Sequence, residues 1–297
     1  MLPLLRTGSA LLAAALCATG LAAQSWSSAV TAASKSSSSA RILVLDVASN
    51  HVLASRNLPE AARTLAAPGS TLKPLVLYQL LARNRWDPAQ RVACNGNLVV
   101  ASHRLACSHP LATPFDARQA LAWSCNTYFA QVARTLRPGE LDALLRPTGL
   151  LARTDLAPNE AIAEFHSPQT PDETQLALLG VEGIRITPLE LAEAYRWLAR
   201  ELAAHHGSVP AQTVLSGLTD SASFGMAGQA GLGGVPIAGK TGTAESIASA
   251  QTHGWFAGLA PAARPEVVIL VFVPSGRGAD AAHLAGILLA HSPLVPR

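Results

Sequence analysis

The sequence is poor in lysine, in overall charge and in aromatic residues. Only 3 of the basic residues are lysines, whereas 19 are arginines; the charged fraction is 14% and the aromatic fraction 5%. The net charge of +3 is modest, and no basic run is interleaved with aromatic side chains, which argues against a nucleic-acid partner. With 49% hydrophobic residues, the chain can still bury one large domain or two lobes that share a core.

Long hydrophobic runs are also scarce, and the one near the N-terminus is predicted to be a leader. Residues 1–23 contain one arginine and then an apolar run that ends in small residues, which is typical of a secretory signal, although an uncleaved membrane anchor is the alternative. We therefore expect export to the periplasm or to the outer face of the cytoplasmic membrane. Residues 24–40 are rich in serine and predict a flexible linker before the folded domain of residues 41–297.

Cysteine is limited to four residues, and their spacing matches no zinc motif. Cys94 and Cys107 bracket a short segment and, outside the cytoplasm, are equally compatible with a disulfide and with two free thiols. Cys125 precedes an apolar helical run and is interpreted as a buried small hydrophobe. The chain also lacks the H-E-x-x-H, G-x-S-x-G and phosphate-loop patterns, so we expect neither a metal nor a cofactor.

The hydrophobic patterning predicts strands at both ends of the folded domain and helices between them. RILVLDV and VLASR form an expected hairpin, whereas IAGKTGTAE, THGWFAGLA and PEVVILVFV predict three later strands and ADAAHLAGILLA a closing helix. The segment from about 86 to 212 is mainly helical, and Thr187 with Pro188 marks the start of its longest helix. The predicted fold class is α/β of the α+β type: an antiparallel sheet built from both chain ends, flanked by helices, with an inserted helical lobe.

Two of the three lysines stand in positions that require an explanation. Lys73 follows Ser70 by three residues at the expected start of a helix, so the two side chains share one face. A serine there is commonly only an N-cap, with the lysine solvated. In a chain that otherwise uses arginine, however, a lysine indicates a need for deprotonation, which the guanidinium group does not allow.

Two further patterns complete a set of three. Ser124 and Asn126 are separated by one residue, and Ser124 is a candidate cap for a helix that starts near Asn126. Lys240 and Gly242 lie in a run typical of a strand, where the missing side chain of Gly242 lets another segment approach the backbone closely. Each pattern is weak alone, since a lysine in a strand of small residues is commonly an edge-strand charge.

In the order S-x-x-K, S-x-N, K-T-G, the three patterns resemble the transpeptidase domain of penicillin-binding proteins, within the superfamily that includes the serine beta-lactamases. The resemblance runs from about Arg41 to Leu289. It implies a serine D,D-peptidase of peptidoglycan that forms an acyl-enzyme, closest to the D,D-transpeptidases. The implied partners are stem peptides ending in D-alanyl-D-alanine and beta-lactams as covalent inhibitors.

The same resemblance assigns the acylation chemistry to the first two motifs. It implies that Ser70 attacks the carbonyl carbon and that Lys73 takes its proton. Ser124 relays a proton toward the leaving nitrogen, and Asn126 holds Lys73 and the substrate amide.

The third motif is assigned to substrate binding. Lys240 and Thr241 are implied to bind the substrate carboxylate, Gly242 completes the K-T-G strand, and the backbone N–H groups of Ser70 and Thr243 form the oxyanion hole.

Three alternatives remain open at this level. A D,D-carboxypeptidase and a beta-lactamase share these motifs, and a non-catalytic beta-lactam sensor would be acylated without turnover. The beta-lactamase alternative is disfavoured because the chain has Glu160 and Glu164 where class A enzymes carry E-x-x-L-N.

Overall fold

The computed structural model describes residues 26–110, 114–245 and 251–295. Its main feature is a five-stranded sheet in the order β2-β1-β9-β8-β7, in which every neighbouring pair is antiparallel. Two strands come from the N-terminal end of the domain and three from the C-terminal end: β1(Arg41–Asp46), β2(Val52–Arg56), β7(Ala238–Glu245), β8(Thr252–Ala260) and β9(Val267–Val273). The predicted sheet from both chain ends is therefore confirmed, and β7 forms one of its edges.

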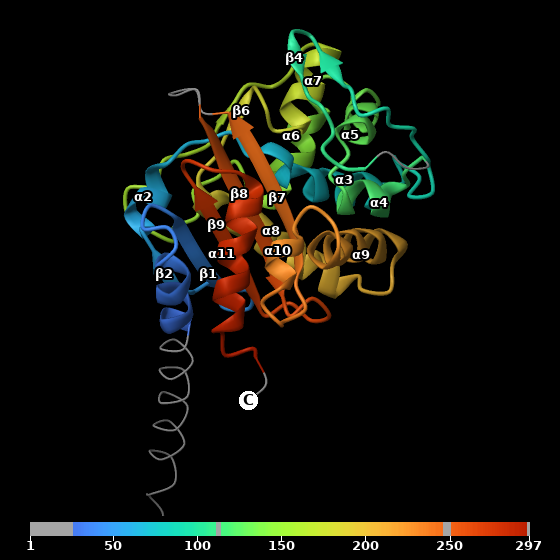
Figure 1. Ribbon diagram of the computed structural model, residues 1–297. Helices are drawn as coiled ribbons and strands as arrows, with labels where there is room; N and C mark the ends of the chain where they lie inside the picture. Colours follow the sequence, from blue (N-terminus) through green and yellow to red (C-terminus); the bar gives the residue numbers. More distant parts are fainter. Residues whose placement is uncertain (1–25, 111–113, 246–250, 296–297) are drawn as a thin grey trace, which may run out of the picture.

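The sheet is covered on both faces, which explains the continuous hydrophobic run of β9. All seven residues of β9 are buried. On β1, Ile42 and Val44 pack into one core with α11(Gly278–Ala290), whereas Leu43 and Leu45 pack into a second core with α8(Pro188–Ala204). This alternation follows from the two-residue period of side chains along a strand. In Figure 1, α11 crosses one face of the sheet.

Residues 26–34 are helical and belong to the folded body, which corrects the predicted flexible linker in its described part. Trp26 and Val30 are each 3% exposed and pack into the core that contains α11. Serine-rich composition suggested a solvated tether, but the apolar residues of this stretch recur at helical spacing and bury one face against the sheet. Residues 1–23, with the predicted leader or anchor, lie outside the described residues; within the described ranges no helix is long and apolar enough to span a membrane.

The elements between β2 and β7 are mostly helical; several of them lie beside the β7 edge of the sheet, whereas the long helix α8 covers one of its faces (Figure 1). The longest helix among the described residues, α8, begins as predicted: Thr187 is the N-cap, Pro188 is the first helical residue, and Thr187 and Glu190 form a capping box. Two small two-stranded antiparallel sheets, β3–β4 and β5–β6, interrupt the helices. These elements are α2(Leu58–Arg63), η1(Gly69–Leu72), α3(Lys73–Ala82), β3(Val99–Val100), β4(His103–Arg104), α4(Ala117–Ala122), α5(Asn126–Ala133), α6(Glu140–Leu145), η2(Arg146–Thr148), β5(Glu164–Phe165), α7(Pro171–Leu178), β6(Ile184–Arg185), α8, α9(Val209–Ser223) and α10(Gly228–Gly231).

Candidate active site

Ser70 lies in a 3-10 turn rather than in the first turn of an α-helix. The turn η1 precedes α3, which begins at Lys73. Side chains three residues apart nearly eclipse one another in a 3-10 turn, so this geometry still places Ser70 and Lys73 on the same side. Ser70 is half-buried, whereas Lys73 is completely buried. Ser70 is therefore partly accessible from outside, whereas Lys73 is enclosed by the protein.

The chain leading into this turn is fixed by close backbone contacts. Gly69 has φ +55° and its N–H donates to the carbonyl oxygen of Gly180 at 2.9 Å. A Cβ atom on Gly180 would lie 2.2 Å from the carbonyl oxygen of Gly69, so neither position has room for a side chain. The position of the turn that carries Ser70 is therefore fixed by a hydrogen bond to Gly180 and by close backbone packing against it.

Three buried side chains from distant segments hold the same turn through hydrogen bonds, and no local sequence pattern indicates these contacts. Trp255 Nε1 donates to the carbonyl oxygen of Ala67 at 2.9 Å, and His253 Nε2 lies 2.8 Å from the same oxygen. Tyr195 Oη donates to the carbonyl oxygen of Thr71 at 3.0 Å. Tyr195 and Trp255 are both 0% exposed, so these bonds are shielded from water.

The amine of Lys73 is directed to the S-x-N motif. Its Nζ donates to the carbonyl oxygen of Ser124 at 2.8 Å, to Ser124 Oγ at 3.3 Å and to Asn126 Oδ1 at 2.7 Å. It also lies 5.2 Å from the ring centroid of Phe129. The side chain is thus oriented by several partners while its stem is packed in the core.

Ser124 does not cap the following helix, contrary to the sequence expectation. The N-cap of α5 is Cys125, which makes no side-chain cap hydrogen bond, and Ser124 has φ +55°. This left-handed conformation turns the hydroxyl away from the helix start and toward the two lysines. Such a strained backbone position in a non-glycine residue is common at functional sites.

Lys240 reaches the same hydroxyl from the edge strand. It is 0% exposed, and its Nζ donates to Ser124 Oγ at 2.7 Å and to the carbonyl oxygen of Thr241 at 3.0 Å. The interpretation of Lys240 as an ordinary edge-strand charge is therefore wrong. Ser124 Oγ accepts hydrogen bonds from both buried lysines.

Gly242 allows β7 to lie directly against the turn of Ser70. A Cβ atom there would lie 2.5 Å from the carbonyl oxygen of Pro68 and 3.4 Å from the backbone nitrogen of Ser70. The predicted close approach at Gly242 is confirmed, and the segment that approaches is the turn η1. Since β7 is an edge strand, backbone groups on its outer side are not used by a neighbouring strand.

Thr241 and Thr243 extend toward the start of α11 rather than toward Ser124. A Cβ atom on Gly278 would lie 2.8 Å from Thr241 Cβ, and the Gly278 N–H donates to Thr243 Oγ1 at 2.9 Å. Thr241 is 6% exposed, whereas Thr243 is exposed. The structure therefore brings five of the predicted residues together. Lys73 and Lys240 contact the Ser124 hydroxyl, Asn126 accepts from Lys73, and Ser70 lies in the turn before Lys73. Both threonines lie on the adjoining strand β7.

The electrostatics of the site follow from the burial of two amines. Burial lowers the pKa of Lys73 from 10.5 to about 7. Burial, followed by the positive charge of Lys73, lowers the pKa of Lys240 well below its usual value. Because both amines contact the same hydroxyl, the site favours a state in which one of them is neutral. A neutral lysine is competent as a general base.

The two glutamates that occupy the class A beta-lactamase interval are engaged elsewhere. Glu160 is 7% exposed and accepts hydrogen bonds from the backbone N–H groups of Thr154, Asp155 and Ala157. Glu164 forms an ion pair with Arg185 at 2.8 Å. Both carboxylates therefore stabilise their own segment.

Comparison with known protein families shows the family of the chain. The family model of the penicillin binding protein transpeptidase domain matches residues 40–290. The chain belongs to this family. This match confirms the family resemblance indicated by the three motifs, and the fold class predicted from the sequence agrees with it.

Two curated relatives are similar to part of this chain. Peptidoglycan D,D-transpeptidase MrdA of Acinetobacter baumannii is 26% identical over 289 residues, covering 76% of this chain and 42% of MrdA. Peptidoglycan D,D-transpeptidase PbpA of Mycolicibacterium smegmatis is 28% identical over 190 residues, covering 54% of this chain and 38% of PbpA. The chain thus spans less than half the length of either relative.

Among solved structures, the transpeptidase domain of Burkholderia pseudomallei penicillin-binding protein 3 superposes with a TM-score of 0.79 at 20% identity, covering 92% of this chain and 93% of that one. A peptidoglycan glycosyltransferase from Burkholderia ambifaria gives 0.78 at 21% identity, covering 91% and 94%. PBP2 of Pseudomonas aeruginosa gives 0.73 at 22% identity, covering 89% and 74%. These similarities show that the fold is shared.

Proposed function

We propose that this chain is a peptidoglycan D,D-transpeptidase that acylates Ser70 with stem peptides ending in D-alanyl-D-alanine. The observation that carries the proposal is the convergence of Lys73 and Lys240 on Ser124 Oγ, with Lys73 directly following the turn that contains Ser70. Burying two amines against one hydroxyl is unfavourable for stability, because each would lose hydration as a cation. Such an arrangement is expected where proton transfer is required.

In the proposed acylation, Ser70 Oγ attacks the carbonyl carbon of the penultimate D-alanine and neutral Lys73 accepts the hydroxyl proton. The tetrahedral intermediate collapses when the C–N bond to the terminal D-alanine breaks. Ser124 passes a proton to that nitrogen and is reprotonated by Lys73, so that D-alanine leaves as an amine. An acceptor amine then attacks the ester carbonyl and releases Ser70.

Binding of the substrate carboxylate would determine which of the two lysines is protonated. A carboxylate bound beside Lys240 and the threonines of β7 favours the ammonium form of Lys240. The neighbouring positive charge then favours the neutral form of Lys73. Substrate binding would therefore create the protonation state that acylation requires.

The proposed oxyanion hole lies between the turn of Ser70 and the outer side of β7. A Cβ atom on Gly69 would lie 3.0 Å from the backbone nitrogen of Thr243, so these two backbones are in close contact. The N–H groups of Ser70 and Thr243 are proposed to stabilise the developing oxyanion. The edge strand also offers backbone groups for an extended peptide.

Export is part of the proposal, since peptidoglycan is assembled outside the cytoplasm. It rests on the sequence of residues 1–23, with periplasm or the outer face of the cytoplasmic membrane as the location. Hydrolase activity, as in a D,D-carboxypeptidase, would differ only in using water as the acceptor.

Intact-mass spectrometry with penicillin tests the acylation step. Ring opening joins the lactam carbonyl to Ser70 Oγ and leaves the nitrogen attached, so the chain should gain the full mass of one penicillin. Ser70→Ala should gain none, whereas Ser223→Ala should react as wild type, because Ser223 Oγ only donates to the carbonyl oxygen of Thr219. An adduct on the Ser70→Ala protein would contradict the mechanism.

The time course separates the alternatives. Because Glu160 and Glu164 are held by other groups, we expect the adduct to persist. Rapid return of the free mass with hydrolysed drug would instead indicate a beta-lactamase. With a stem pentapeptide, release of D-alanine only in the presence of an acceptor amine supports a transpeptidase, and release in water alone supports a carboxypeptidase.

A further inference from the structure

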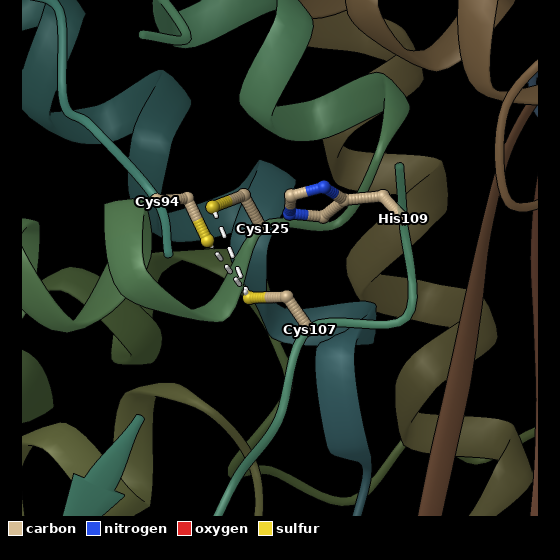
Figure 2. Close-up of side chains that lie close together, drawn as sticks. All are labelled: Cys94, Cys107, His109 and Cys125. Atoms are coloured by element: carbon tan, nitrogen blue, oxygen red, sulfur yellow. Dashed lines mark hydrogen bonds between the residues drawn. The ribbon is translucent and has the colours of Figure 1, made fainter. Parts of the chain in front are cut away.

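Three cysteines and one histidine meet beside the S-x-N motif, although their sequence spacing predicted no metal site. Cys94, Cys107, Cys125 and His109 each place one potential ligand atom within 4.8 Å of all the others (Figure 2). Cys107 Sγ lies 3.5 Å from Cys94 Sγ and 4.0 Å from Cys125 Sγ. The interpretation of Cys125 as only a buried hydrophobe is incomplete, because its sulfur faces this cluster.

The sulfur separations match metal coordination better than a disulfide. All three residues are free cysteines, and a disulfide needs an S–S distance of about 2.05 Å. Tetrahedral coordination at a metal–sulfur distance of about 2.3 Å places neighbouring sulfurs about 3.8 Å apart. The two observed distances lie on either side of this value.

His109 supplies an independent indication of a ligand. Its side chain is buried with 6% exposure, and Nδ1 lies 2.9 Å from the carbonyl oxygen of Pro110. Nδ1 must carry the proton in that hydrogen bond, which leaves a lone pair on Nε2. Nε2 is buried and has no hydrogen-bond partner among the described residues. In Figure 2 the imidazole ring lies beside the three sulfurs.

We propose that Cys94, Cys107, Cys125 and His109 form a tetrahedral site for a thiophilic divalent metal ion, with Zn²⁺ as the expected occupant. Three thiolates and one imidazole nitrogen are a typical ligand set for structural zinc. Binding would release the three thiol protons as the metal–sulfur bonds form. With four protein ligands the site is closed, so its role is structural rather than hydrolytic.

Hydrogen bonds connect this site to the catalytic motif. The Asn126 N–H donates to Cys107 Sγ at 3.2 Å, and the Gly96 N–H donates to Cys94 Sγ at 3.4 Å. Asn126 Nδ2 donates to the carbonyl oxygens of Leu105 and Ala106, each at 3.2 Å. The segment that carries Cys107 therefore contacts both the backbone and the side chain of Asn126, whose Oδ1 accepts from Lys73. A bound metal would fix Asn126 through these contacts.

The first test is metal content. Full-length protein, purified without added chelator, should contain about one zinc per chain by mass spectrometry of the metal. Cys107→Ser and His109→Ala should lose this metal, whereas His103→Ala should retain it. His103 lies in the same segment but faces Glu182 at 3.8 Å, which makes it a matched control.

Cobalt replacement reports the ligand set directly. The metal-free protein titrated with Co²⁺ should develop sulfur-to-cobalt absorption in the near ultraviolet and intense tetrahedral bands in the visible, saturating at one equivalent. Loss of the sulfur band in Cys94→Ser would place that thiolate on the metal. If a ligand variant does not fold, thermal melting of the wild-type protein still decides the question, since zinc should raise its melting temperature only if it binds the folded state.

Three results would overturn the proposal. One is equal metal content in the wild-type and Cys107→Ser proteins. Another is a mass two daltons low with a peptide linking Cys94 and Cys107, which would establish the disulfide. The third is free, titratable thiols at Cys94, Cys107 and Cys125 in folded protein that takes up no Co²⁺. If penicillin acylates the metal-free protein more slowly, the metal also helps to position Asn126. This readout rests on the proposed function, whereas the metal measurements do not.

Discussion

Lys240 Nζ donates to Ser124 Oγ at 2.7 Å, so one hydrogen bond joins a residue of the edge strand to a residue of the helical region. The third participant, Lys73, reaches the same hydroxyl from the start of α3. Three segments that are far apart in the sequence therefore depend on one another for their positions. The two lysines nevertheless have different proposed tasks, and these tasks can be separated by experiment.

Replacing each lysine by arginine separates proton transfer from charge. Lys73→Arg keeps a cation but cannot deprotonate at working pH, so acylation by a fluorescent penicillin should fall by about 10²–10⁴-fold. Lys240→Arg retains a cation for the substrate carboxylate and should slow labelling by a smaller factor. Thermal melting must show that both proteins fold. Labelling of Lys73→Arg as fast as wild type, or faster than Lys240→Arg, would show that Lys73 is not the base.

The pH dependence of acylation should report the same amine. Burial lowers the pKa of Lys73 to about 7, so the neutral base predominates above that pH and the ammonium form below it. The acylation rate should therefore rise from pH 5.5 to pH 8.5, with a midpoint near 7 in stopped-flow measurements. The residual rate of Lys73→Arg serves as the control, and it should lack this midpoint. A wild-type rate that is flat over this range would argue against a titrating lysine base.

The sequence could predict which residues meet at the candidate site because a few short motifs contain them, and it could predict the strands because their hydrophobic runs are long. It could not predict the contacts that hold the site. The cap assigned to Ser124 was wrong because a left-handed backbone conformation directs the hydroxyl to the lysines. The helix of residues 26–34 was not predicted, because the serine-rich composition indicated a linker although the apolar residues recur at helical spacing.

Contacts between residues from different segments were the feature that the sequence predicted least well. His109 and Cys125 are separated by a turn and by α4, and only the folded chain places them together. Tyr195 lies 124 residues from Thr71 in sequence, and its hydroxyl carries no local pattern that would indicate their hydrogen bond. Such contacts depend on how helices and sheet pack, which single-sequence motifs do not encode.

Removing the Tyr195 hydroxyl should affect both stability and acylation. Tyr195→Phe leaves the buried carbonyl oxygen of Thr71 without this donor, at a loss of about 1–3 kcal/mol of unfolding free energy. The turn of Ser70 should then be less well positioned and acylate more slowly. Tyr78→Phe is the matched control, since its hydroxyl donates to Glu201 away from this turn. A lowered melting temperature with an unchanged acylation rate would limit Tyr195 to a structural role.

Adding a single methyl group at Gly242 should displace the edge strand from the turn of Ser70. The new Cβ would lie 2.5 Å from the carbonyl oxygen of Pro68, a backbone atom that cannot move without moving the turn. Overpacking of this kind commonly lowers the unfolding free energy by about 1–3 kcal/mol. Because the turn and the strand together form the proposed oxyanion hole, Gly242→Ala should slow acylation beyond what its loss of stability explains.

The matched control for this change is Gly207→Ala, since a Cβ atom at Gly207 meets no other atom within 4 Å. It should melt and acylate as the wild-type protein does. The comparison is made well below the melting temperature of both variants, so that each is fully folded when penicillin is added. If Gly242→Ala acylates at the wild-type rate, the strand can move away from Ser70 without loss. The backbone N–H of Thr243 would then be unnecessary for stabilising the oxyanion.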